Sequence, residues 1–313
     1  MSAVFVSGEG DSSEPGQADR AKPPDLVLRC TIDRYDDGTR LRDPLSVDTD
    51  HFGASGEILV ADTGNNLVSV FSASGKTRQK IGKGAAICAP IGAVFDRRGR
   101  IVVSEMDSPI LKVLDFKGAL AERIDLSRHQ EDGEEAINPG RLACDAEGNL
   151  HVIDRGNQKV LVLDEKGRLL RKLGGRGHDE GQFRMLQDLA FDDEGACYLT
   201  SARETAVHVF DSRGRFLIRF GEHGYSASGF SFPCGIALDE QGRVWVADSL
   251  QHEVKVLDSQ GGYLFSWGVP GEAEGALNYP VDLTFDSKGS LLILEKGNAR
   301  VQVFQFAEVP AGK

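Results

Sequence analysis

The sequence lacks several features that would place it in a class at once. No stretch approaches the run of about 18 apolar residues that a membrane-spanning helix needs. The N-terminal segment, MSAVFVSGEGDSSEPGQADRAKPP, has no basic region followed by a sustained apolar stretch, so it does not look like a secretory signal. We therefore expect a soluble, cytoplasmic protein without a transmembrane segment.

Cysteines are few and basic residues are scattered. The five cysteines are odd in number, lie far apart and form no CxxC pair, which argues against a disulfide framework or a zinc site. Cys144 and Cys197 occupy apolar positions and are interpreted as small buried residues in a reducing compartment. The net charge is -12 and no basic patch stands out, so we do not expect a nucleic-acid partner.

What the sequence does contain is one pattern repeated six times. A short apolar run is followed by a Gly turn such as DRRGR 96–100 and then by a strand that ends in an acid, such as LHVID 150–154. A polar turn, a third strand such as VHVFD 207–211 and a fourth such as RFLIRFG 215–221 complete the unit. The alternation of apolar and polar residues predicts β-strands. The copies open at residues 44, 90, 139, 186, 233 and 280, which gives spacings of 46, 49, 47, 47 and 47.

Four antiparallel strands in each unit are typical of a propeller blade. The sixth copy stops after VQVFQF without a fourth strand, whereas the strand-like segment LVLRCTI 26–32 precedes the first copy. Ile32 lies 12 residues before Pro44, close to the spacing of a fourth strand in the other copies. We therefore predict an all-β, six-bladed β-propeller of four-stranded antiparallel blades, closed by the N-terminal strand that completes the last blade.

The same pattern sets the expected domain boundaries. Residues 1–23 are rich in Ser, Gly, Pro and acids and are predicted to form a disordered tail. Residues 24–306 form the single propeller domain, and residues 307–313 form a short C-terminal tail.

Several segments resemble the NHL repeat. They are ILVADTGNNLVSVF 58–71, LHVIDRGNQKVLVL 150–163 and LLILEKGNARVQVF 291–304, together with the connectors GGRGHDEGQF 174–183 and GEHGYSASGF 221–230. The resemblance covers roughly residues 26–306 and implies a six-bladed propeller. Propellers of this family serve as protein-interaction platforms, RNA-binding domains, extracellular sensors and occasionally enzymes, so function has to be argued from the site.

An acid ends the second strand in five of the six copies. These residues are Asp62, Glu105, Asp154, Asp248 and Glu295, with Ser201 in the remaining place. One interpretation is a carboxylate-lined funnel that could hold a divalent cation, with Asp62, Asp154, Asp248 and Glu295 as weak metal candidates. The other is that each acid caps the following turn, and we favour it because the acid belongs to the repeat itself. No cofactor is predicted, although a cation in the central channel is left open.

Positions that differ between copies are more informative about a ligand. Two residues after the start of each copy stand Ser46, Gly92, Arg141, Asp188, Gly235 and Asp282. We expect them in loops around the central opening, where Arg141 could hold a carboxylate or phosphate and the two Asp could accept hydroxyls or a cation. Arg155, in the turn after Asp154, is added as a ligand-binding residue. The alternative is a set of solvated polar residues around a water-filled channel.

No catalytic motif is concentrated in the chain. The seven His do not recur at one repeat position, and no Ser lies in a G-x-S-x-G elbow. We predict a monomeric, non-enzymatic binding or scaffold propeller that recognises a protein or small-molecule partner through its loop face and central funnel. The alternative is a metal-dependent lyase or hydrolase with its site in the funnel. RNA binding ranks third because of the acidic balance.

Overall fold

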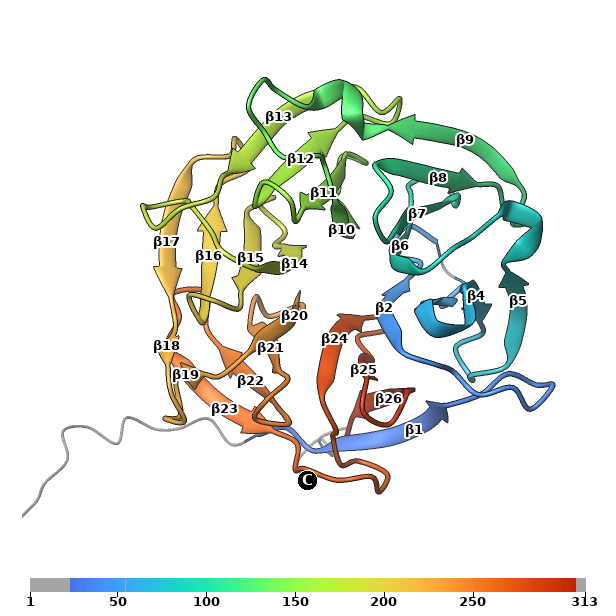
Figure 1. The fold of residues 1–313 in the computed structure, drawn as a ribbon. Coiled ribbons are helices and arrows are strands. Elements are labelled where there is room, and N and C mark those ends of the chain that lie inside the picture. The colour runs from blue at the N-terminus through green and yellow to red at the C-terminus, as the bar shows by residue number, and fades with distance from the viewer. Residues whose placement is uncertain (1–22, 54, 308–313) are drawn as a thin grey trace, which may run out of the picture.

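Six four-stranded antiparallel sheets form a ring around a central axis (Figure 1). The computed structural model describes residues 23–53 and 55–307. Nearly all of the two predicted tails, residues 1–23 and 307–313, therefore lies outside the described residues. The described helices are short turns, and none of them has the length and apolar character needed to cross a bilayer.

The blades follow the six predicted copies in chain order. The first blade consists of β2 (Pro44–Thr49), β3 (Ile58–Asp62), β4 (Leu67–Phe71) and β5 (Thr77–Ile81). The second consists of β6 (Pro90–Phe95), β7 (Ile101–Glu105), β8 (Ile110–Leu114) and β9 (Leu120–Asp125). The third consists of β10 (Pro139–Cys144), β11 (Leu150–Asp154), β12 (Lys159–Leu163) and β13 (Leu169–Gly174). The fourth blade consists of β14 (Leu186–Phe191), β15 (Cys197–Ser201), β16 (Ala206–Phe210) and β17 (Phe216–Phe220). The fifth consists of β20 (Pro233–Leu238), β21 (Val244–Asp248), β22 (Glu253–Leu257) and β23 (Tyr263–Trp267). The sixth consists of β24 (Pro280–Phe285), β25 (Leu291–Glu295), β26 (Arg300–Phe306) and β1 (Leu26–Ile32).

The remaining elements lie in turns and in the segments that link blades. They are the 3₁₀ turns η1 (Thr63–Asn65), η2 (Lys83–Ala85) and η3 (Leu126–His129), and the short strands β18 (Glu222–His223) and β19 (Gly229–Phe230). We call the segments between blades connectors; they comprise residues 33–43, 82–89, 126–138, 175–185, 221–232 and 268–279.

The antiparallel order gives the ring two distinct faces. In each blade the first strand lies nearest the axis and begins where a connector ends (Figure 1). The connectors therefore lie on the same face as the turns between second and third strands, and we call this the connector face. The opposite face carries the Gly turns, such as the one in which Asp96 accepts hydrogen bonds from the amides of Arg98 and Arg100 at 2.9 and 2.8 Å and Gly99 has φ 71°. We call it the turn face.

The ring closes as predicted. β1 pairs with β26 in antiparallel register from Leu26↔Phe306 to Ile32↔Val301, which makes it the outer strand of the sixth blade. Beyond the strands, the amide of Ala307 donates to the carbonyl of Asp25 at 2.8 Å. One edge of the last blade is thus covered by the first strand of the chain.

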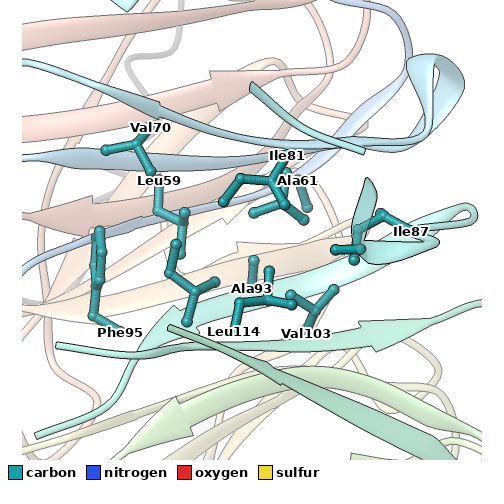
Figure 2. Close-up of a cluster of buried hydrophobic side chains, with 12 residues drawn as sticks. Leu59, Ala61, Val70, Ile81, Ile87, Ala93, Phe95, Val103 and Leu114 are labelled. Carbon is teal, nitrogen blue, oxygen red and sulfur yellow. The ribbon is translucent and has the colours of Figure 1, made fainter. Parts of the chain in front are cut away.

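Apolar cores lie between neighbouring blades. Alternate residues of one strand point to opposite faces of the sheet. In β3, Leu59 and Ala61 therefore pack toward the second blade, whereas Ile58 and Val60 pack toward the sixth. Figure 2 shows the first of these clusters, in which Leu59 and Val70 lie opposite Phe95 and Leu114. Six such clusters hold the ring together among the described residues.

Deleting residues 1–33 should destabilise the protein severely. The truncation exposes the edge of β26 and removes Ile32, which is fully buried between the sixth and first blades. We expect the free energy of unfolding to fall by at least about 3 kcal/mol, measured by chemical denaturation. Deleting only residues 1–22 keeps every described pairing of β1 and serves as the control. Equal stability of the two truncations would contradict closure by β1.

Candidate functional site

The innermost strands, not the loops, carry the variable residues predicted for the funnel. Ser46, Gly92, Arg141, Asp188, Gly235 and Asp282 each lie in the first strand of their blade, at its third residue. The expectation that they occupy loops is therefore wrong. Two residues after the copy starts, the chain has already entered the strand that lines the axis, so these positions face the inside of the ring.

Three of the predicted residues form one ion cluster, which we call the axial ion triad. The guanidinium of Arg141 forms an ion pair with Asp282, and its Nη1 lies 3.4 Å from Oδ2 of Asp188. Its Nη2 donates to the carbonyl of Val281 at 2.8 Å. Arg141 belongs to the third blade and Asp282 to the sixth, on the opposite side of the ring (Figure 1). The arginine side chain therefore crosses the axis.

The two carboxylates of the triad also hold neighbouring blades together. Oδ2 of Asp282 accepts the amide of Val47 in the first blade at 2.7 Å. Oδ2 of Asp188 accepts the amide of Ile236 in the fifth blade at 3.1 Å. Asp188 and Asp282 are buried. The alternative of solvated side chains around a water-filled channel does not describe these groups.

Burial governs the protonation of the triad. It raises the pKa of both carboxyl groups, although the charge of Arg141 acts in the opposite direction on each. Burial also disfavours the charged guanidinium, but the charges of Asp282 and Asp188 raise the pKa of Arg141 overall. Two carboxylates share one cation, and Asp188 has the longer contact to Arg141.

Arg141 lines two cavities, one on each side of the triad. The cavity that opens on the turn face has a volume of about 280 Å³, and Asp48, His51 and Asp286 lie in its wall. The cavity that opens on the connector face has a volume of about 550 Å³. Arg141 therefore lies between two cavities, one on each face of the ring.

The connector-face cavity combines an apolar wall with cationic groups. Its apolar lining includes Leu45, Ile91, Leu186, Phe232 and Val281, and polar groups come from Arg155, Ser249, Tyr279, Lys296 and the rim residue Asp43. Arg155 donates from Nη2 to Oδ1 of Asn138 at 2.9 Å, while its buried Nε has no hydrogen-bond partner among the described residues. Within the described chain, neither Arg155 nor Lys296 forms an ion pair.

Lys296 was missed by the sequence analysis, although the repeat contains the signal for it. It follows Glu295 directly, as Arg155 follows Asp154, so the two cations occupy the same repeat position in opposite blades. The other blades carry Thr63, Met106, Ala202 and Ser249 at this position. Only a comparison of the copies at this one position would have singled it out.

The acids that end the second strands are buried and engaged by the connectors. Asp154 accepts the amides of Asn138 at 3.1 Å and of Gly156 at 3.0 Å. Asp62 accepts the amide of Arg42 at 2.8 Å, and Asp248 accepts the amides of Ser231 and Phe232 at 2.7 and 3.0 Å. Glu295 accepts the amide of Asn278 at 2.8 Å and a bond from Arg300 Nε at 2.7 Å. Each acid thus fastens a connector to its blade.

The fourth blade makes the same connection with different residues. Ser201 stands where the others have an acid, and Glu204, three residues later, accepts the amide of Arg184 in the connector at 2.9 Å. The hydroxyl of Ser201 donates to the carbonyl of Arg184 at 2.8 Å and to Glu204. The bond to the connector is therefore kept, although its acceptor stands three residues later than in the other blades. Aligning the copies at the strand end did not reveal this role of Glu204.

This donor set does not fit a carboxylate-held metal. The four metal candidates, Asp62, Asp154, Asp248 and Glu295, are separated into different blades and bonded to amides and cations of the chain. Asp188 and Asp282 both form ion pairs with Arg141. Among residues 23–53 and 55–307, no three His, Cys, Asp or Glu side chains gather as metal ligands would.

The structure is thus a six-bladed β-propeller with a ligand-sized cavity on its connector face. The sequence pattern of the NHL repeat matches residues 277–304, which comprise the end of the last connector, β24, β25 and most of β26. This match and the six-bladed ring support the resemblance of the chain to NHL-repeat propellers. No functionally curated protein matches the sequence significantly.

Solved structures with the same fold include enzymes. A gluconolactonase from Xanthomonas campestris has 18% identity and a TM-score of 0.66, with 94% of both chains covered. The virginiamycin B lyase from Staphylococcus aureus has 13% identity and a TM-score of 0.62, over 92% of this chain and 90% of that one. A streptogramin B lyase has 12% identity and a TM-score of 0.61, over 90% and 97%. At these identities the similarity establishes the fold alone.

Replacing Arg141 by Leu should destabilise the protein in a pH-dependent way. At pH 7 the substitution leaves two buried carboxyl groups without their cation, and we expect a loss of about 3–5 kcal/mol in the free energy of unfolding. A raised carboxyl pKa means that the folded state binds protons more readily than the unfolded state, so stability falls as pH rises through the unfolded pKa toward the folded one. The loss should therefore shrink on acidification toward pH 4–5, about where unfolded carboxyls begin to titrate.

Urea denaturation of the wild-type protein and the Arg141→Leu variant at several pH values checks this prediction. Arg155→Leu is the matched control, because Arg155 has no carboxylate partner within the described chain. A pH-independent loss, or an equal loss in both variants, would contradict the role of the triad.

Proposed function

We propose that the connector-face cavity binds a small anionic molecule with an apolar body, and that the protein acts on it as a hydrolase or lyase. The observation that carries the proposal is the pair of cations, Arg155 and Lys296, in the wall of a cavity that opens on the connector face and has a largely apolar lining. The cavity volume of about 550 Å³ suits a small molecule of this class.

The cations are free to bind an anion because the fold does not use their charges. Buried cations near the connectors are matched, as Lys112 is with Glu105 at 2.7 Å and Arg300 with Glu295 at 2.7 Å. Arg155 is half-buried and Lys296 is exposed. Arg155 and Lys296 have no such partner among the described residues, and the unpartnered Nε of Arg155 is a donor without an acceptor. A carboxylate or phosphate would satisfy both charge and hydrogen bonding.

The enzymatic part of the proposal is supported by the fold and by the groups at the cavity wall. The similar propellers described above are a lactonase and lyases, which favours our enzymatic alternative over the non-enzymatic scaffold that we preferred from the sequence. Tyr279, Lys296 and Asp43 provide hydroxyl, ammonium and carboxylate groups for proton transfer at the same chamber. Because the carboxylates do not fit a metal site, the proposal assigns the chemistry to these side chains.

A binding protein without catalysis is the second candidate. Cys234, the one cysteine among the described residues in the cavity wall, is held as a thiol because burial raises its pKa to about 12. No described Ser or Cys of this wall is hydrogen-bonded to a His as an activated nucleophile would be. This observation favours recognition without turnover. The net charge of -12 continues to argue against nucleic acid as the ligand.

Anionic esters, lactones and phosphorylated metabolites of small size form the test panel. We expect at least one to bind, measured by calorimetry, and Arg155→Leu or Lys296→Met to weaken it by about ten- to hundredfold, as loss of a charged hydrogen bond does. Hydrolysis releases a proton that a pH indicator detects, and elimination produces a double bond that absorbs in the ultraviolet. Turnover supports the enzyme, and binding without turnover supports the second candidate.

Lys288→Met is the matched control for Lys296→Met. Lys288 lies in the Gly turn between β24 and β25 on the turn face, away from the connector-face cavity. It should leave binding unchanged. If neither cavity substitution changes the affinity of any bound anion, the cavity is not the binding site.

A further inference from the structure

The third residue of the third strand fastens a connector in most blades. This position carries Ser69, Lys112, Leu161, His208, Lys255 and Gln302, and all six side chains are buried. Ser69 bonds to the hydroxyl of Tyr35 at 2.9 Å, and Lys112 donates to the carbonyl of Ala86. In each case the side chain bonds to the connector that precedes its own blade. The position is therefore a second attachment point for connectors.

In the fifth blade an ammonium group fills a slot of backbone carbonyls. Nζ of Lys255 donates to the carbonyls of Ser226 at 3.0 Å, Ala227 at 3.4 Å and Gly229. The same ammonium lies 5.8 Å from the ring centroid of Phe230. The slot thus satisfies a buried cation with carbonyl oxygens and an aromatic face.

In the sixth blade a guanidinium group fills the equivalent slot. Arg300 donates from Nη2 to the carbonyls of Ala273 at 2.9 Å and Ala276 at 2.8 Å, and from Nη1 to Glu272 at 2.9 Å. Nε2 of Gln302 adds a bond to Ala276 at 2.9 Å. The same arrangement of backbone carbonyls is therefore filled by a lysine in the fifth blade and by an arginine from a different strand position in the sixth.

The connector of the fourth blade has the same backbone structure. The amide of Gln182 donates to the carbonyl of Asp179 at 3.0 Å, as Gly229 donates to Ser226 and Ala276 to Ala273, both at 3.1 Å. A second bond, from Gly177 to Phe183 at 3.2 Å, matches Gly224 to Phe230 and Gly271 to Leu277, both at 3.0 Å. The carbonyl slot is therefore built in all three connectors.

The fourth blade supplies no cation to its slot from the third strand. Ala206 stands at the position of Arg300, and His208 stands at the position of Lys255. His208 is 1% exposed, and neither ring nitrogen has a hydrogen-bond partner among the described residues. Burial, with the charge of Arg219 adding to it, lowers the pKa of His208 to about 4, so the ring is neutral at pH 7 and one nitrogen is a free acceptor.

A cavity of about 350 Å³ lies at this place. His178, Asp179, Glu180, Gly181 and His208 line it from the connector and third strand, and residues 216–219 line it from the fourth strand. Phe183 packs edge-on against His208 with ring centroids 4.8 Å apart, at the connector position that Phe230 occupies beside Lys255. Asp179 and Glu180 outweigh the single positive charge of Arg219.

We propose that this cavity binds a primary ammonium compound from solution, with His208 and the connector carbonyls as acceptors, in the place that Lys255 fills in the next blade. Three N–H donors of an ammonium match the carbonyl and imidazole acceptors, whereas the described side chains do not form a metal-ligand group. The site lies in one blade, away from the axis, so it is independent of the function proposed for the connector-face cavity.

Binding of n-butylammonium, with tetramethylammonium as control, tests the proposal. Calorimetry and the ¹⁵N shifts of the His208 imidazole should report binding of n-butylammonium, because it donates hydrogen bonds to the ring. Tetramethylammonium carries the same charge without N–H donors and should bind at least about tenfold more weakly. Equal binding of the two, no binding of either, or a response only to inorganic phosphate would overturn the proposal.

Two substitutions test the comparison between blades. His208→Lys should place an ammonium in the slot as Lys255 does, raising the melting temperature and abolishing n-butylammonium binding. His208→Leu, which copies Leu161 of the third blade, should keep the fold and weaken binding by at least about tenfold. Unchanged n-butylammonium affinity in the folded Leu variant would remove His208 from the site.

Discussion

The need to cover both faces of every blade is the constraint on which this structure depends. All five residues of the second strand are buried in every blade, so each sheet has two faces that pack away from water. A ring of six sheets solves this only if it has no uncovered end. The pairing of β1 with β26 provides the last contact, and the cluster around Ile32, Leu294 and Val301 joins the sixth blade to the first.

Polar interactions then decide where the connectors lie. The strand-end acids accept hydrogen bonds from backbone amides of the connectors. The third residue of the third strand, such as Lys255, binds backbone carbonyls of the connectors. Both positions are fixed by the repeat. Residues that perform this task are unavailable to a ligand, however much they look like a catalytic ring. The groups that the fold leaves without such a partner, among the described residues, include Arg155, Lys296 and His208, at positions where most blades carry other residues.

The sequence was sufficient for the architecture and for part of the site. Period-two alternation, Gly turns and a constant spacing define each blade locally, and the missing fourth strand of the last copy revealed the closure. Arg141, Asp188 and Asp282 were singled out because they vary, and the ring does bring them together. Their mutual neutralisation was not predictable, because it depends on which blades lie opposite each other and on the reach of one arginine across the axis.

Other features depended on three-dimensional context that no single copy contains. Glu204 takes over from a strand-end acid only because a turn brings it back to the same amide. Lys296 lines the cavity because its blade lies opposite that of Arg155. The lack of a hydrogen-bond partner for His208, among the described residues, stands out only when its slot is compared with the filled slots of the next two blades. In each case the sequence supplied the residue, whereas the packing of different blades determined what it touches.

The closure by β1 also determines how the molecule can be joined to something else. Asp25 and Ala307 are hydrogen-bonded to each other at the outer strand of the sixth blade, on the circumference of the ring (Figure 1). A domain fused before Asp25 or after Ala307 would leave from this one point on the rim, and a short peptide could join the two residues to give a circular chain. Attachment to a surface by either route would leave both mouths of the axial channel open to solvent.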